Sequence, residues 1–94
     1  MIGSFRSKAL KRFWERNDAR GINPRWVEKV SIVLDALEAA SGPEEMNLST
    51  FHFHPLTGNL AGRYSVTITR NFRITFSWKD ENAVHIDLED YHAR

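Results

Sequence analysis

The chain has 94 residues, no cysteine and a formal net charge of +1, with 41% hydrophobic and 27% charged residues. This size and composition predict one small folded domain over residues 1–94. The lack of cysteine excludes a disulfide scaffold, a zinc ribbon, an iron–sulfur site and a thiol enzyme. No apolar run approaches the roughly 20 residues of a membrane-spanning helix, so we expect a soluble cytoplasmic protein.

The charges are distributed in blocks along the chain. Residues 1–29 hold eight Lys/Arg and three Asp/Glu, a net +5. Residues 30–50 hold four Asp/Glu and no Lys/Arg, a net −4. Residues 51–78 hold three arginines and no acid, a net +3, and residues 79–94 carry a net −3. The near-neutral total therefore hides two basic segments, which is the pattern expected when different surfaces meet different partners.

The first half of the chain predicts a short strand and two helices. The apolar residues 2–5 are expected to form an edge strand, and Ser7 is a typical N-cap of a helix that runs to about Asn17. Asn23 followed by proline marks the start of a second helix, over about 24–40. Its apolar residues recur at helical spacing: Trp26, Val30, Val33, Leu34 and Leu37.

The second half changes to the two-residue period of strands. Strands are predicted over residues 51–54, ending at Pro55, and over 63–69, 72–78 and 83–90. The element order is therefore β-α-α-β-β-β-β. We expect an α+β fold in which two helices cover one face of a small, mainly antiparallel sheet.

Alternation along these strands separates an apolar face from a polar one. The apolar face is expected to carry Phe51, Phe53, Tyr64, Val66, Ile68, Phe72, Ile74, Phe76, Trp78, Val84, Ile86 and Leu88. The polar face is expected to carry His52, His54, Ser65, Thr67, Thr69, Arg73, Thr75, Ser77, His85, Asp87, Glu89 and Tyr91. The polar set fits either a solvated sheet face or a shallow basic cleft that binds phosphate.

Several chemistries fit the polar face. The Arg73 guanidinium matches phosphate oxygens, and His54 and His92 can act as acid or base near neutral pH. Exposed arginine and aromatic side chains can also hold single-stranded RNA. His52 and His54 could instead form a metal pair completed by Asp87 or Glu89, although no zinc-motif spacing is present.

The chain resembles the HigB family, toxins of bacterial toxin–antitoxin modules within the RelE/ParE superfamily. The resemblance rests on an ordered set of segments that extends to His92: Ile2-Gly-Ser-Phe5, His54-Pro-Leu-Thr-Gly58, Arg63-Tyr-Ser-Val-Thr-Ile68, Asn71-Phe-Arg-Ile-Thr-Phe76 and Glu89-Asp-Tyr-His92. It implies a RelE-like fold, two helices packed on a twisted, mainly antiparallel sheet. It also implies an endoribonuclease that cleaves translated mRNA on the ribosome and so inhibits translation.

The chemistry that the resemblance implies needs no metal or cofactor, because the RNA 2′-hydroxyl attacks the adjacent phosphorus. The products would be a 2′,3′-cyclic phosphate and a 5′-hydroxyl end. By position, the implied catalytic residues are His54, Arg73, Tyr91 and His92. Arg73 would stabilise the charge on phosphate, and the two histidines and Tyr91 would share the roles of base and acid.

Three further residues are expected to bind substrate: Thr57, Arg63 and Arg70. Thr57 stands directly after His-Pro-Leu, where some relatives carry lysine, and we expect Arg63 to compensate for the missing cation. The implied partners are the 70S ribosome with its mRNA, a helix-turn-helix antitoxin similar to HigA, and operator DNA through the toxin–antitoxin complex. No membrane partner is expected.

Two other functions are compatible with the same fold. One is a non-catalytic ParE-like toxin that acts on gyrase, and the other is a ribosome- or RNA-binding module whose polar face only holds phosphates. A ParE-like toxin does not need the histidine, arginine and tyrosine set, so the presence of that set favours the nuclease.

Overall fold

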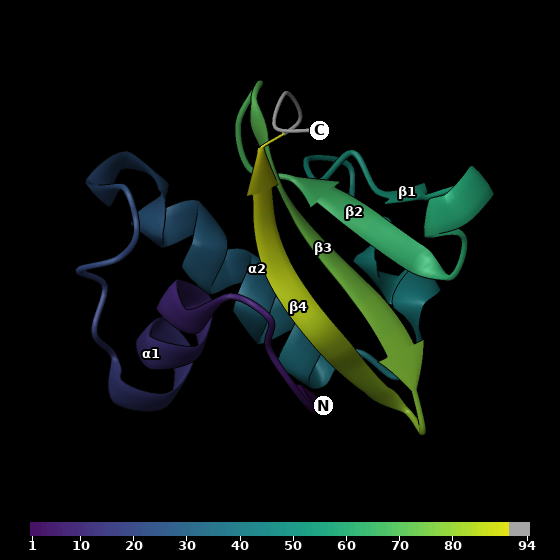
Figure 1. Ribbon diagram of the computed structural model, residues 1–94, viewed down its shortest axis with the longest axis horizontal. Helices are drawn as coiled ribbons and strands as arrows, with labels where there is room; N and C mark the ends of the chain where they lie inside the picture. Colours follow the sequence, from purple (N-terminus) through teal and green to yellow (C-terminus); the bar gives the residue numbers. More distant parts are fainter. Residues whose placement is uncertain (91–94) are drawn as a thin grey trace.

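The computed structural model describes residues 1–90 and shows two helices beside an antiparallel sheet. The elements are α1 (Lys8–Arg16), α2 (Val27–Ala39), β1 (His54–Pro55), β2 (Arg63–Thr67), β3 (Phe72–Lys79) and β4 (Asn82–Asp90). Each strand pairs with the next one along the chain, in the order β1-β2-β3-β4. Helix α2 lies behind the sheet and α1 lies beside β4 (Figure 1). The α+β class is confirmed.

The α1 helix starts where the sequence predicts, whereas α2 starts at Val27, after a 3-10 turn over Pro24–Trp26, and not at Pro24. The Ser7 hydroxyl accepts a hydrogen bond from the Leu10 N–H at 3.1 Å, which satisfies a free donor of the first turn of α1. The Asn23 side chain accepts from the Arg25 N–H at 2.9 Å and opens a 3-10 turn that leads into α2. In the described chain, no helix is long and apolar enough to cross a membrane.

The strand predicted before the helices is not formed, and this prediction was wrong. The opening segment makes only two isolated parallel bridges to β4, Ile2 to Ala83 and Phe5 to Ile86. Between them, His85 has a φ of 53° and bends the β4 backbone out of strand geometry. The Ser4 side chain, and not a carbonyl, accepts from the His85 N–H at 2.8 Å. The parallel ladder is therefore interrupted at its centre.

The same bulge changes which β4 residues enter the core. Between β3 and β4 the pairing passes from Thr75 opposite Asp87 to Ser77 opposite Val84, so β4 carries one extra residue there. Ala83 is consequently buried, whereas Val84, predicted for the core, is only half-buried and its Cγ1 lies against Gly3. Strict alternation fails because a bulge reverses the faces on one side of it.

The core lies between α2 and the sheet. Val30, Val33, Leu34 and Leu37 form the predicted stripe and are fully buried. They belong to one cluster with the sheet residues Val66, Ile74, Phe76 and Ile86. Burial of apolar area at about 25 cal/mol per Å² makes this layer the main stabilising contribution.

The first strand differs from its predicted range. β1 consists of His54–Pro55, so it begins later than predicted, and Pro55, its last residue, pairs with Tyr64. A proline is tolerated here because β1 is an edge strand that needs no further donor. His52 has a φ of 48° and lies outside β1, so His52 and His54 do not share one strand, as the alternative of a metal pair would require. Phe51 is buried as predicted.

The two hairpins that follow fix the register of the sheet. β2 ends at Thr67, earlier than predicted, because the N–H groups of Ile68 and Thr69 both bond the Phe72 carbonyl and close the turn. Asp80 and Glu81 have φ values of 52° and 67°, the left-handed pair typical of a two-residue type I′ hairpin. Both turns occur where the sequence places them.

Candidate active site

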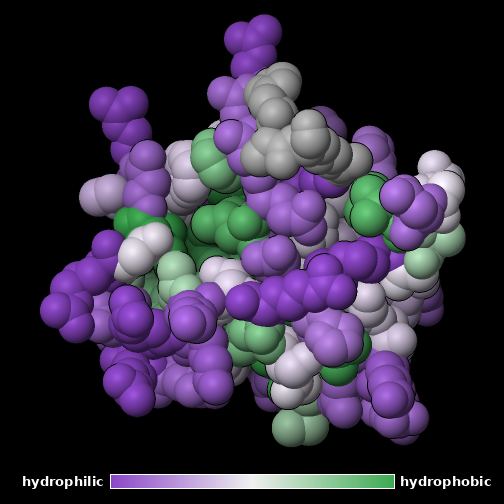
Figure 2. Space-filling view, in the orientation of Figure 1, coloured by the Kyte–Doolittle hydropathy of each residue, from purple (hydrophilic) through white to green (hydrophobic). Residues whose placement is uncertain are grey.

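The sheet register aligns polar side chains in rows across one face. Direct cross-strand partners point to the same side of a sheet, so each row is a line of neighbouring side chains. The rows are Thr67, Arg73 and Glu89; His54, Ser65, Thr75 and Asp87; and Arg63 with Ser77. This face points toward the viewer in Figure 1, and its surface is mostly hydrophilic (Figure 2).

The centre of this face is buried, which contradicts a loosely solvated sheet surface. The exposed fractions are 0% for Thr75, 1% for Ser65, 4% for Arg73 and 8% for Arg63. Buried polar groups need hydrogen-bonding or charged partners, because desolvation without them is costly. The arrangement of these partners is therefore the main feature of the site.

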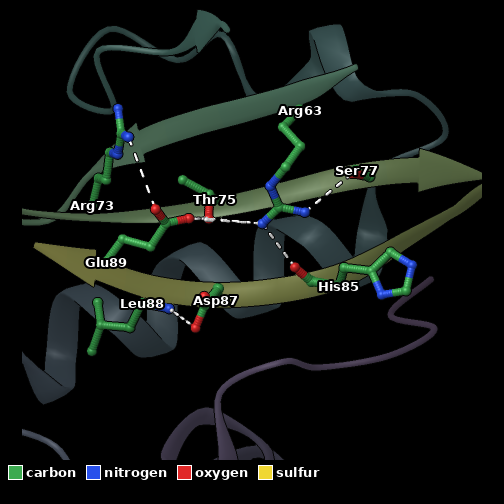
Figure 3. Close-up of polar contacts among 8 residues, drawn as sticks. All are labelled: Arg63, Arg73, Thr75, Ser77, His85, Asp87, Leu88 and Glu89. Atoms are coloured by element: carbon green, nitrogen blue, oxygen red, sulfur yellow. Dashed lines mark hydrogen bonds and ion pairs between the residues drawn. The ribbon is translucent and has the colours of Figure 1, made fainter. Parts of the chain in front are cut away.

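Arg63 reaches across β3 and is held by three groups. Its Nη1 donates to Ser77 Oγ at 3.1 Å, and its Nη2 donates to Thr75 Oγ1 at 2.8 Å and to the His85 carbonyl at 2.9 Å (Figure 3). The His85 carbonyl is available because the bulge interrupts normal pairing at this residue. Arg63 is the first residue of β2, and these three contacts fix its guanidinium over the sheet.

Glu89 lies between the two buried arginines. Its Oε2 accepts a hydrogen bond from the Thr75 hydroxyl and is 3.9 Å from Arg63 Nη2. Its Oε1 is 3.9 Å from Arg73 Nη2 (Figure 3). Two guanidinium groups therefore contact the same carboxylate.

The pKa of Arg63 is lowered by its burial and by the neighbouring cations. Burial lowers the pKa of Arg63, and the nearby Arg6 and Arg73 lower it further, while Glu89 and Asp87 act in the opposite direction. A guanidinium remains protonated at neutral pH even so, because its ordinary pKa lies far above neutrality. The face therefore presents permanent positive charge to an anionic ligand.

His54 lies at the edge of the face, on β1. Its side chain is exposed and its Nδ1 is 2.7 Å from the Phe53 carbonyl. A carbonyl can only accept, so in the neutral ring this contact places the proton on Nδ1 and leaves Nε2 with a lone pair. His54 can thus accept a proton from a group that reaches the Nε2 side.

The remaining predicted residues are scattered or undescribed. Arg70 is exposed in the turn after β2, and Thr57 is exposed near the opposite end of that strand, where the Leu56 N–H bonds the Arg63 carbonyl at 2.8 Å. The two therefore do not meet in one subsite. Tyr91 and His92 lie outside the described residues.

Sequence reasoning missed the residues that connect the arginines. Thr75 and Ser77 were expected on the polar face without a role, and Glu89 was considered only as a metal ligand. The useful signal was the strand register, which places Arg73 directly opposite Glu89. Among residues 1–90, no group of three or more histidine or acidic side chains is close enough to hold a metal ion.

Comparison with known proteins gives one consistent family. Residues 3–92 match the family described as RelE-like toxin of type II toxin-antitoxin system HigB. The Endoribonuclease HigB of Proteus vulgaris is 35% identical over 98% of this chain and 100% of its own length. Toxin HigB-1 of Vibrio cholerae is 27% identical over 97% of this chain and 98% of its own.

Solved structures show the same fold. The crystal structure of YafQ from E. coli strain BL21(DE3) superposes with a TM-score of 0.59 at 10% identity, covering 99% of this chain and 97% of that one. The YoeB-YefM complex from Staphylococcus aureus contains a chain with a TM-score of 0.58 at 21% identity, with 98% of both chains covered.

Proposed function

The chain belongs to the HigB family of RelE-like toxins of type II toxin–antitoxin systems and is an endoribonuclease toxin, and we propose that it cleaves mRNA on the translating ribosome. The observation that carries this proposal is the buried pair of arginines on the polar face, each 3.9 Å from a Glu89 oxygen. Fixed guanidinium groups of this kind suit a phosphate whose negative charge grows in the transition state.

The proposed reaction uses the substrate's own nucleophile. The 2′-oxygen forms a bond to phosphorus, the bond from phosphorus to the 5′-oxygen breaks, and a 2′,3′-cyclic phosphate results. A base must take the 2′-hydroxyl proton and an acid must protonate the 5′-oxygen. We assign the base to His54 Nε2 or to His92, and the acid to the other histidine or to Tyr91.

Arg73 is assigned to the phosphate. Its planar fork can donate to two phosphate oxygens at once, and the neighbouring Arg63 adds charge without leaving its own partners. This differs from the expectation that Arg63 replaces a missing lysine by direct contact. Thr57 and Arg70, which are exposed at opposite ends of β2, are proposed contacts for the mRNA on either side of the scissile bond.

A toxin–antitoxin system implies a cognate antitoxin. We propose a helix-turn-helix protein similar to HigA, with operator DNA bound by the complex, and the 70S ribosome as the second partner. The basic surface of α1 is the proposed ribosomal RNA contact, because it carries exposed lysine and arginine side chains.

Primer extension on a defined mRNA tests the function directly. Purified protein should cut the mRNA only when 70S ribosomes translate it, and Arg73→Ala should lower the cleavage rate by at least ~100-fold. Arg25→Ala, an exposed arginine before α2, is the matched control and should cleave normally. Cleavage of free mRNA, or full activity of Arg73→Ala, would contradict the proposal. Intact mRNA with a DNA-supercoiling defect would support a ParE-like function.

A further inference from the structure

The Thr75 hydroxyl has a fixed direction. It accepts from Arg63 Nη2 at 2.8 Å and bonds Glu89 Oε2 on its other side. A hydroxyl has one hydrogen and a guanidinium can only donate, so the Thr75 hydrogen must point to the carboxylate. Because Thr75 is fully buried, it does not reach a ligand from the position it occupies.

Arg63, which donates to Thr75, is itself immobilised. Ser77 and the His85 carbonyl hold two of its nitrogens, and only 8% of the residue is exposed. The order of contacts is therefore Arg63, Thr75, Glu89 and Arg73, running from the middle of the sheet toward the end of β4. Thr75 and Glu89 each contact the group that precedes them in this order.

Glu89 connects the contacts of Arg63 and Thr75 to Arg73. The two residues are direct cross-strand partners, and Glu89 Oε1 is 3.9 Å from Arg73 Nη2 while Oε2 is held by Thr75. A carboxylate fixed at one oxygen presents the other at a defined place and angle. At this distance the contact is an ion pair and not a hydrogen bond, and its Coulomb attraction favours the guanidinium orientation that faces Glu89.

We propose that Thr75 and Glu89 are positioning residues that orient the Arg73 guanidinium toward the scissile phosphate. This inference rests on the proposed role of Arg73 in RNA cleavage. Preorganised cations stabilise a transition state without reorganising during the reaction, so loss of orientation should lower kcat more than it raises KM.

Cleavage kinetics on ribosome-bound mRNA supply the first test. Thr75→Val removes the hydroxyl and should lower kcat by at least ~10-fold with KM within about twofold of wild type. Thr75→Ser keeps the hydroxyl and should restore kcat to within about threefold. Glu89→Gln should behave like Thr75→Val. The matched control is Glu81→Gln, an exposed acid in the β3–β4 hairpin outside this cluster, which should cleave at the wild-type rate.

Nuclear magnetic resonance of the Arg73 side chain in the free protein supplies a second test that needs no cleavage. The Arg73 guanidinium should rotate slowly in wild type and Thr75→Ser, and faster in Thr75→Val and Glu89→Gln. An unchanged Arg73 signal in both of the latter variants would overturn the inference, as would a loss of activity expressed in KM alone. If Thr75→Val does not fold, Glu89→Gln decides.

The two tests separate this inference from the function on which it rests. Altered Arg73 rotation together with no ribosome-dependent cleavage by wild type would support the positioning and reject the nuclease. Normal wild-type cleavage with unaltered kcat in Thr75→Val and Glu89→Gln would retain the nuclease and reject the positioning.

Discussion

Two regions of the molecule carry its positive charge in opposite ways. On the sheet, Arg63 and Arg73 are 8% and 4% exposed and share Glu89, so their geometry is fixed by neighbours. On α1, the cations lie in solvent along one helix face: Lys8, Lys11, Arg12 and Arg16. Their opposite face, with Leu10 buried and Trp14 half-buried, attaches the helix to the rest of the protein.

The difference separates positioned charge from long-range charge. A buried guanidinium loses hydration and is tolerated only with partners, which then determine its direction. An exposed cation keeps its hydration and acts through a field that salt screens within about 10 Å. We therefore expect the sheet arginines to control the rate of the chemical step, and the α1 cations to control association with RNA.

Among the substitutions that distinguish these two regions, Arg73→Lys should have the largest effect, and the effect should be on kcat. Lysine keeps the charge but replaces the planar fork with a flexible ammonium, so bidentate contact to phosphate is lost. We expect kcat to fall by about 100-fold at saturating ribosome concentration, with KM little changed. Single-turnover cleavage of ribosome-bound mRNA measures this. A lysine variant with wild-type kcat would show that charge alone suffices and that the two regions are equivalent.

Removal of the four α1 cations should have an effect of the opposite kind. Alanine at positions 8, 11, 12 and 16 should raise the apparent KM for ribosomes by about 10-fold near physiological salt and leave kcat unchanged. The dependence of log KM on log salt should weaken by roughly 0.7–0.9 per lost phosphate contact. Glu15→Ala, an acidic residue on the same helix, is the control. An unchanged salt dependence would mean that α1 does not contact RNA.

The sequence predicts α1 better than it predicts the sheet arginines. Ser7 and Asn23 identify helix starts because capping is a local interaction between neighbours in the chain. The polar face, including Arg73 and His54 on it, follows from alternation. The burial of Arg63 does not, since it depends on Thr75, Ser77 and the His85 carbonyl, which are 12 to 22 residues away.

The bulge at His85 explains most of the remaining differences. It reverses the expected faces of Ala83 and Val84, interrupts pairing with the opening segment and frees a carbonyl for Arg63. The φ of 53° at His85 could not be predicted from the sequence, because glycine or asparagine usually occupies positions with a positive φ. The cross-strand register, which the sequence alone does not show, therefore determines which polar residues are neighbours in the site.

Ser7→Ala should affect stability without affecting either kind of charge. The substitution leaves the Leu10 N–H without its capping oxygen and should cost about 1 kcal/mol of unfolding free energy. For a domain of this size, the midpoint of thermal unfolding should fall by about 4–8 °C. Calorimetry and cleavage assays at 25 °C measure both effects. A drop in kcat for the folded variant would mean that the end of α1 contributes to the catalytic geometry.

The Asp18–Arg20 pair should give the smallest effect and marks the limit of what an exposed charge contributes. Arg20 bonds both Asp18 carboxylate oxygens, at 2.8 to 3.2 Å, and this contact lowers the Asp18 pKa to about 2. A depressed acid pKa stabilises the fold above the ordinary value of 3.8, and the contribution disappears as pH falls toward 2.

Arg20→Ala should therefore raise the Asp18 pKa toward 3.8, as measured by a carboxyl titration followed by nuclear magnetic resonance. The stability of the variant should differ slightly from wild type at neutral pH and match it below about pH 2. Cleavage and its salt dependence should stay unchanged, because this pair belongs neither to the sheet cluster nor to the α1 cations. A change in the salt dependence would extend the RNA-binding surface beyond α1 into the following loop.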